Sequence, residues 1–152
     1  MTKFGKVVFV TLAALLVGGA IPTSASAAKW HKGSPKALRG NFQAKRTSSA
    51  EGFGAAFTLT KSRFEMGVSN MPVQIMSHLK YKKVGKHLYR LKGHIAKNGF
   101  VLARNADFAV YRKGKTFACT DYGYHKKHGF AKVNYAKQVK HFKNGGPILK
   151  SY

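Results

Sequence analysis

Short alternating segments separated by glycine-containing turns constrain this chain more than any other feature of its sequence. Across residues 88–96, apolar or aromatic side chains alternate with basic or polar ones, which is the two-residue period of a half-buried β-strand. Lys97-Asn98-Gly99 then predicts a hairpin turn, because asparagine and glycine tolerate the positive φ angles of tight turns. Such segments, repeated at spacings of roughly eight to twelve residues, predict an all-β domain.

Other strand candidates extend this interpretation over most of the chain. They cover residues 38–46, 55–60, 63–68, 71–81, 100–104, 108–112 and 115–124, of which 55–60 and 63–68 are two short strands or one bent strand. Residues 71–81 favour a strand, with a helix capped by Asn70 and followed by Pro72 as the alternative. Residues 105–107 are expected to form a bulge or turn, and residues 130–142 fit either a strand or one short C-terminal helix. We therefore expect a small antiparallel up-and-down barrel or meander, closed or nearly closed so that few strand edges are exposed.

The first 27 residues have the pattern of a secretory signal. Lys3 and Lys6 precede an uncharged apolar run over residues 7–21, and Ala25-Ser26-Ala27 offers small side chains to a signal peptidase. A retained N-terminal anchor is the alternative. We expect a signal peptide over 1–27, an extended lead-in over 28–36 with Trp30 closing one end of the domain, a single barrel-like domain over 37–142 and a tail over 143–152. The expected location is extracellular, in association with the cell wall.

The charge balance points to anionic partners. The 152 residues include 28 lysines and arginines but four aspartates and glutamates, for a formal net charge of +24. Self-repulsion at this density opposes compaction, so an anionic partner would stabilise the fold. Lysine predominates over arginine, which suits phosphate groups bound by point charges. Expected partners are anionic wall polymers such as teichoic acids, with extracellular nucleic acid or an anionic membrane surface as alternatives.

Basic and aromatic residues are interleaved in the central and C-terminal parts of the chain, as in Tyr81-Lys82-Lys83 and Tyr111-Arg112-Lys113. Neighbouring side chains of a strand face opposite sides, so the aromatic rings can fill a barrel while the cations coat it. The predicted polyanion-binding residues are the cations of these hairpins. They are Lys80, Lys82, Lys83, Lys86, Arg90, Lys92, Arg112, Lys113, Lys115, Lys126 and Lys127.

Catalytic and metal-binding patterns are lacking in the sequence. The four acids are scattered at positions 51, 65, 107 and 121, whereas paired-carboxylate catalysis needs two acids beside one bond. His125 and His128, with His141 further along, lie among lysines whose charge disfavours a cation. Cys119 is the only cysteine, so it can form no internal disulfide, and we expect it to be a buried apolar side chain. The expectation is a non-enzymatic protein without metal or cofactor.

Two segments resemble a known family. Lys36-Ala-Leu-Arg-Gly-Asn-Phe resembles the opening Gly-x-Trp strand of lipocalin-like, calycin-type barrels, with Phe42 in the place of tryptophan. Residues 57–64 and 81–93 resemble small secreted proteins of Gram-positive, lactic-acid-type bacteria, which are largely uncharacterised. The resemblance covers about residues 30–127. It implies a small β-barrel, and a fold alone does not supply a function.

Three functions remain open. The first is a secreted, non-enzymatic protein held at the cell envelope by anionic polymers. The second is a carrier of a small apolar ligand inside the barrel, although 11 phenylalanines and 7 tyrosines favour a filled interior. The third is an antimicrobial or host-surface-binding protein.

Overall fold

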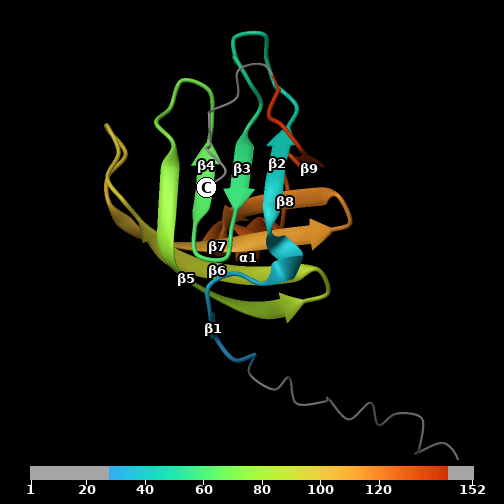
Figure 1. The fold of residues 1–152 in the computed structure, drawn as a ribbon. Coiled ribbons are helices and arrows are strands. Elements are labelled where there is room, and N and C mark those ends of the chain that lie inside the picture. Colours follow the sequence, from blue (N-terminus) through green and yellow to red (C-terminus); the bar gives the residue numbers. More distant parts are fainter. Residues whose placement is uncertain (1–27, 144–152) are drawn as a thin grey trace, which may run out of the picture.

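The described part of the chain is a β-barrel with one short α-helix. The computed structural model describes residues 28–143, so the expected signal peptide and residues 144–152 of the expected tail lie outside it. In chain order the elements are β1 (His31–Lys32), the 3-10 helix η1 (Lys36–Leu38), β2 (Gly40–Ala44), β3 (Ala56–Leu59), β4 (Phe64–Gly67), β5 (Gln74–Gly85), β6 (Leu88–Ile95), β7 (Arg104–Lys113), β8 (Thr116–Asp121), α1 (Tyr122–His128) and β9 (Ala136–Val139) (Figure 1).

The eight strands β2 to β9 form a closed antiparallel ring. Each pairs with the next along the chain, and β9 pairs back with β2. Strand β1 adds to β5 beside the ring. In Figure 1, β2 to β4 stand upright while β6 to β8 cross them at a steep angle. This arrangement confirms the predicted all-β, up-and-down barrel.

Strand β5 bends to join the two sets of strands. Its first part pairs with β4, its second part pairs with β1, and β6 pairs with it on both sides of the bend. The bend lies at a register shift between Ser77 and Lys80, where His78 has a φ of 52°. Across the bend, a Cβ at Gly93 would lie only 2.6 Å from the carbonyl oxygen of Ser77. Glycine at this position therefore permits the close approach of two backbones that closes the barrel.

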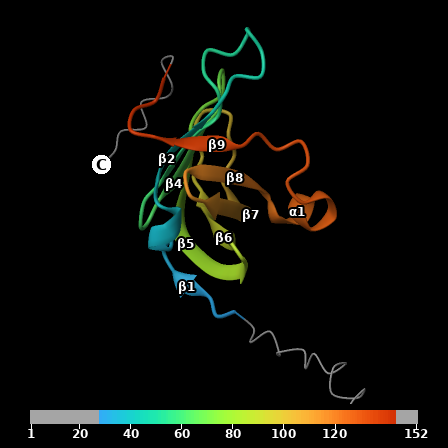
Figure 2. The same cartoon turned by 90° about the vertical axis from the view of Figure 1, so that its right-hand side faces the viewer.

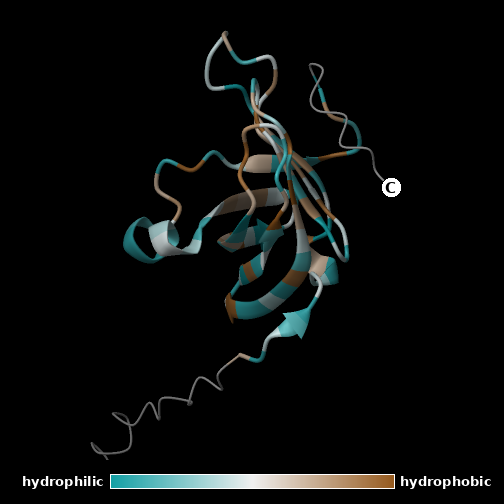
Figure 3. Cartoon of the chain, turned by 90° about the vertical axis from the view of Figure 1, so that its left-hand side faces the viewer, coloured by the Kyte–Doolittle hydropathy of each residue, from teal (hydrophilic) through white to brown (hydrophobic). Residues whose placement is uncertain are grey.

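Aromatic side chains fill the interior. Phe42 and Phe117 stack with ring centroids 4.4 Å apart, and Phe57 and Phe64 pack around them. Cys119, expected to be buried, is partly buried and packs against this core, and desolvation raises the pKa of its thiol. Hydrophobic and hydrophilic residues alternate along the barrel strands (Figure 3). Among residues 28–143, this core also includes Leu38, Leu91 and Val110.

The short helix lies earlier than expected. Residues 130–142 contribute strand β9, whereas α1 occupies Tyr122–His128 and stands out from the barrel beside β7 and β8 (Figure 2). Asp121 caps α1 by accepting a hydrogen bond from the backbone amide of Tyr124 at 3.0 Å, which stabilises a helix start. No helix within residues 28–143 is long and apolar enough to cross a membrane.

Two sequence predictions around β7 were wrong. Residues 105–107 do not form a bulge or turn but continue β7 without interruption. Residues 100–103 lie in the loop before β7 rather than in a strand. The turn itself is present, because Asn98 and Val101 form a paired bridge around Gly99, whose φ is 57°.

Candidate functional site

Four of the predicted cations meet on the outer surface of the barrel. In the register of β5 and β6, Lys80 lies directly opposite Lys92, and Lys82 lies directly opposite Arg90. The side chains point outward because Leu91, between the two β6 cations, is fully buried. We refer to Lys80, Lys82, Arg90 and Lys92 as the cationic face.

One carboxylate, that of Asp107, forms ion pairs with two cations of this face. Arg90 donates from Nε to Oδ1 of Asp107 at 2.8 Å and from Nη2 to Oδ2 at 2.6 Å, and the Nζ of Lys92 lies 3.6 Å from Oδ2. Partial burial alone would raise the pKa of Asp107, but the hydrogen bonds from Arg90 hold it below its usual value. The carboxylate therefore stays ionised, and the four cations still exceed it in charge.

The sequence suggested that Trp30 closes one end of the barrel, but Trp30 lies on the cationic face instead. Its ring centroid is 5.1 Å from Nζ of Lys82, 5.3 Å from Nζ of Lys92 and 5.7 Å from the guanidinium carbon of Arg90. The guanidinium of Arg90 also lies 4.0 Å from the ring centroid of Tyr122, at the start of α1. These cation–π contacts hold the cations together on one side of the barrel.

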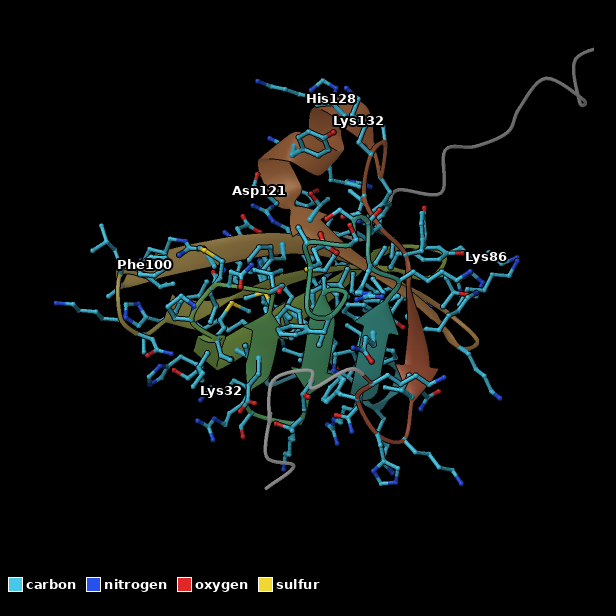
Figure 4. The ribbon with its side chains drawn as sticks, turned by 90° about the horizontal axis from the view of Figure 1, so that it is seen from above. Lys32, Lys86, Phe100, Asp121, His128 and Lys132 are labelled. Carbon is cyan, nitrogen blue, oxygen red and sulfur yellow. The ribbon has the colours of Figure 1, made fainter. Side chains whose placement is uncertain are left out.

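The remaining predicted cations are distributed over other surfaces. Lys126 lies on α1, with its Nζ 5.9 Å from the ring centroid of Tyr122, so it extends the cationic face. Lys127 is exposed on the same helix. The others mark hairpin turns: Lys83 and Lys86 at the β5–β6 turn, and Lys113 and Lys115 at the β7–β8 turn. Lys86 lies at an extremity of the molecule in Figure 4.

Arg112 differs from the other predicted binding residues because it points into one end of the barrel. Its guanidinium lies 4.4 Å from the ring centroid of Phe42 and donates from Nη2 to Oε1 of Gln138 at 2.9 Å. Its Nη1 is buried without a hydrogen-bond partner, and burial lowers its pKa. Arg112 is therefore a packing residue in this structure and does not share the cationic face.

Sequence reasoning missed a second basic surface. A cavity of about 350 Å³ opens on the outside of β2 and β9, and Lys45, Arg46, Lys137 and Lys143 are among the residues that line it. The Gln43 amide holds Lys143 in place, donating to its carbonyl at 3.0 Å and accepting from its amide at 2.8 Å. The adjacent pair Lys45-Arg46 was the only available signal, and it lies outside the aromatic-rich segments.

The four acids are all engaged within the fold. Besides Asp107 and the helix cap Asp121, Glu65 lies 3.8 Å from Arg63, and Glu51 accepts hydrogen bonds from Thr47. Within residues 28–143, no three histidine, cysteine or acidic side chains gather in a group that could hold a metal ion.

Comparison with protein-family models, curated proteins and solved structures found no match. The class that the fold defines is a closed, eight-stranded antiparallel up-and-down barrel.

Proposed function

We propose that this protein is a secreted, non-enzymatic binding protein that associates electrostatically with anionic polymers of the cell envelope, such as teichoic acids. One observation carries the proposal: two like-charged pairs, Lys80 with Lys92 and Lys82 with Arg90, lie directly opposite each other on adjacent strands. Like charges in this position destabilise a sheet. A polyanion lying along the face would relieve that repulsion and stabilise the folded barrel.

The charge distribution favours an external anion over internal neutralisation. Residues 28–143 contain 25 lysines and arginines but four acids, and each acid already has a partner within the fold. Lysine ammonium groups make no fixed bidentate geometry, so they suit the repeated phosphates of a flexible polymer. The proposed contact is therefore made of many weak charge interactions rather than one shaped pocket.

Two further observations favour such a polymer over the alternatives. Phe42, Phe57, Phe64 and Phe117 occupy the barrel interior, which leaves the carrier hypothesis without structural support. On the outer surface, Lys82, Arg90 and Lys92 already contact the ring of Trp30. A nucleic acid would use exposed aromatic faces for base stacking, whereas a teichoic acid needs only the cations.

The proposal is tested by measuring the binding of residues 28–152 to isolated cell walls, with and without their teichoic acids, across a salt series. Binding should be strong at low salt, absent from stripped walls and lost by about 1 M salt, where the Debye length is ~3 Å. Equal binding to intact and stripped walls, or binding that salt does not change, would refute the proposal.

A charge reversal separates stability from binding. Lys80→Glu places a carboxylate opposite Lys92, so we expect the free energy of unfolding to rise by roughly 0.2–1 kcal/mol while wall affinity falls. Lys36→Glu is the matched control, because Lys36 is exposed on η1 rather than on the two strands that carry the cationic face, and the net charge changes equally. Urea unfolding and wall-binding assays measure the two effects. Equal loss of binding in both variants would show that only net charge matters.

A further inference from the structure

Most of the exposed large apolar side chains lie on two loops of the barrel that a hydrogen bond joins. Five large hydrophobic residues are exposed within residues 28–143, and four of them lie on two loops: Val68 and Met71 between β4 and β5, and Phe100 and Leu102 between β6 and β7. The last two are the most exposed, at 67% and 71%. Figure 4 shows Phe100 at an outer extremity of the molecule.

The fold holds these side chains in place. The side-chain amide of Asn98 donates to the carbonyl of Val73 at 2.8 Å, which joins the two loops. The amide and carbonyl of Asn98 also pair with those of Val101 at 3.0 Å and 2.9 Å. Val101 is buried in the core, so Phe100 and Leu102 on either side of it are directed outward. Their exposure is thus a consequence of an ordered turn.

We propose that this apolar tip, made of Val68, Met71, Phe100 and Leu102, inserts into the interface of an anionic lipid bilayer. A projecting turn with apolar side chains at its end can enter the headgroup region without any change in the barrel. Lys97 and Arg104 flank the β6–β7 loop and are exposed, and no acid occurs in residues 68–73 or 96–104. Cations around an apolar tip complement anionic headgroups, each adding to the affinity near the surface.

This inference goes beyond the proposed function and uses other residues. The cationic face binds through charges, which salt screens. The apolar tip would bind through hydrophobic side chains, whose contribution salt does not screen. Polymer binding and bilayer insertion can therefore fail independently. A membrane contact would place the protein at the lipid surface, with its polymer-binding cations still free.

The test compares vesicles of phosphatidylcholine containing about one-third phosphatidylglycerol with vesicles of phosphatidylcholine alone. Residues 28–152 should bind the anionic vesicles preferentially, and Phe100→Ala with Leu102→Ala should weaken that binding roughly tenfold for each side chain removed. Tyr135→Ala is the control, because Tyr135 is the fifth exposed hydrophobic residue and lies outside the apolar tip. Circular dichroism checks that each variant is folded.

A fluorescent reporter examines insertion directly. Phe100→Trp should shift its added emission to shorter wavelength with anionic vesicles, relative to the parent chain carrying Trp30 alone. Binding to teichoic-acid-containing walls should stay unchanged in the alanine double variant, which separates this proposal from the first. Absence of vesicle binding by the parent, unaltered binding of the double variant, or no emission shift would each overturn the insertion proposal. The first outcome would direct attention to a protein partner for the apolar tip.

Discussion

Two tyrosine–arginine pairs that look alike in the sequence face opposite ways in the barrel. In β6, Tyr89 packs against the core and Arg90 points outward to Asp107. In β7, Tyr111 points outward to Phe130, and Arg112 points inward over Phe42. The same dipeptide thus places its arginine on the surface in β6 and against the aromatic core in β7.

Strand register accounts for this difference. Tyr89 lies opposite Val110 and Leu88 opposite Tyr111, so even-numbered residues of β6 share a face with odd-numbered residues of β7. The connecting loop over residues 96–103 sets that offset. A shift of one residue would exchange the faces of the whole strand. Composition therefore identifies candidate binding residues, but turn length decides which of them reach the surface.

The largest expected effect tests the packing of Arg112 over Phe42 inside the barrel. Phe42→Ala removes a fully buried ring that stacks on Phe117 and lies beneath the guanidinium of Arg112, so we expect a loss of about 3–5 kcal/mol of unfolding free energy. Urea denaturation of residues 28–152 measures it. A loss below about 1 kcal/mol would mean that the site collapses around the deletion or that the ring is not packed as described.

A smaller effect distinguishes the two arginines. Arg112→Ala uncovers the buried ring of Phe42 and removes a hydrogen bond to the exposed side chain of Gln138, so we expect a loss of about 1–2 kcal/mol of stability, mainly from packing, with unchanged wall binding. Arg90→Ala should instead reduce wall binding. Arg112→Met is the matched variant, since it keeps a long apolar stem and should recover part of the stability. If Arg112→Ala weakened wall binding more than Arg90→Ala, the contrast between the two residues would be wrong.

The smallest expected effect is a change in pH dependence. The pKa of Asp107 is lowered in the folded state, so its ionised form stabilises the fold above the unfolded pKa of about 3.9. That contribution is lost as pH falls through the folded pKa. Asp107→Asn should cost roughly 1 kcal/mol at neutral pH, since the ion pair is partly exposed, and should flatten the acid limb of stability. Melting temperatures between neutral and strongly acidic pH measure this. If the variant lost stability at acidic pH as steeply as the parent, the acid sensitivity would come from other carboxylates.

Local patterns were sufficient to predict much of the fold. The alternation over residues 88–96 predicted β6 almost to its ends, and the glycine turn at Lys113-Gly114 separates β7 from β8. Helix α1 was missed because Tyr122–His128 has no apolar periodicity, and a side-chain cap from Asp121 stabilises its start. Phe100 was predicted to begin a strand directly after the Asn98-Gly99 turn, whereas the turn extends one residue past Gly99.

The candidate site was less predictable than the fold. Charge identified Lys80, Lys82, Arg90 and Lys92, but their convergence depends on cross-strand register, which a sequence does not state. Trp30 reaches them only because β1 pairs with β5, an interaction between segments about fifty residues apart. The basic cavity lined by Lys45 and Lys143 likewise depends on the closure of β2 onto β9.

The position of Cys119 has a practical consequence. Its partly buried side chain packs against the core and the pKa of its thiol is raised, so a thiol reagent meets little thiolate while the barrel is closed. Oxidising surroundings therefore give it little opportunity to cross-link two copies of the chain. The rate at which a thiol reagent modifies this one sulfur should instead rise when β8 separates from its neighbours, so that rate measures local opening of the barrel.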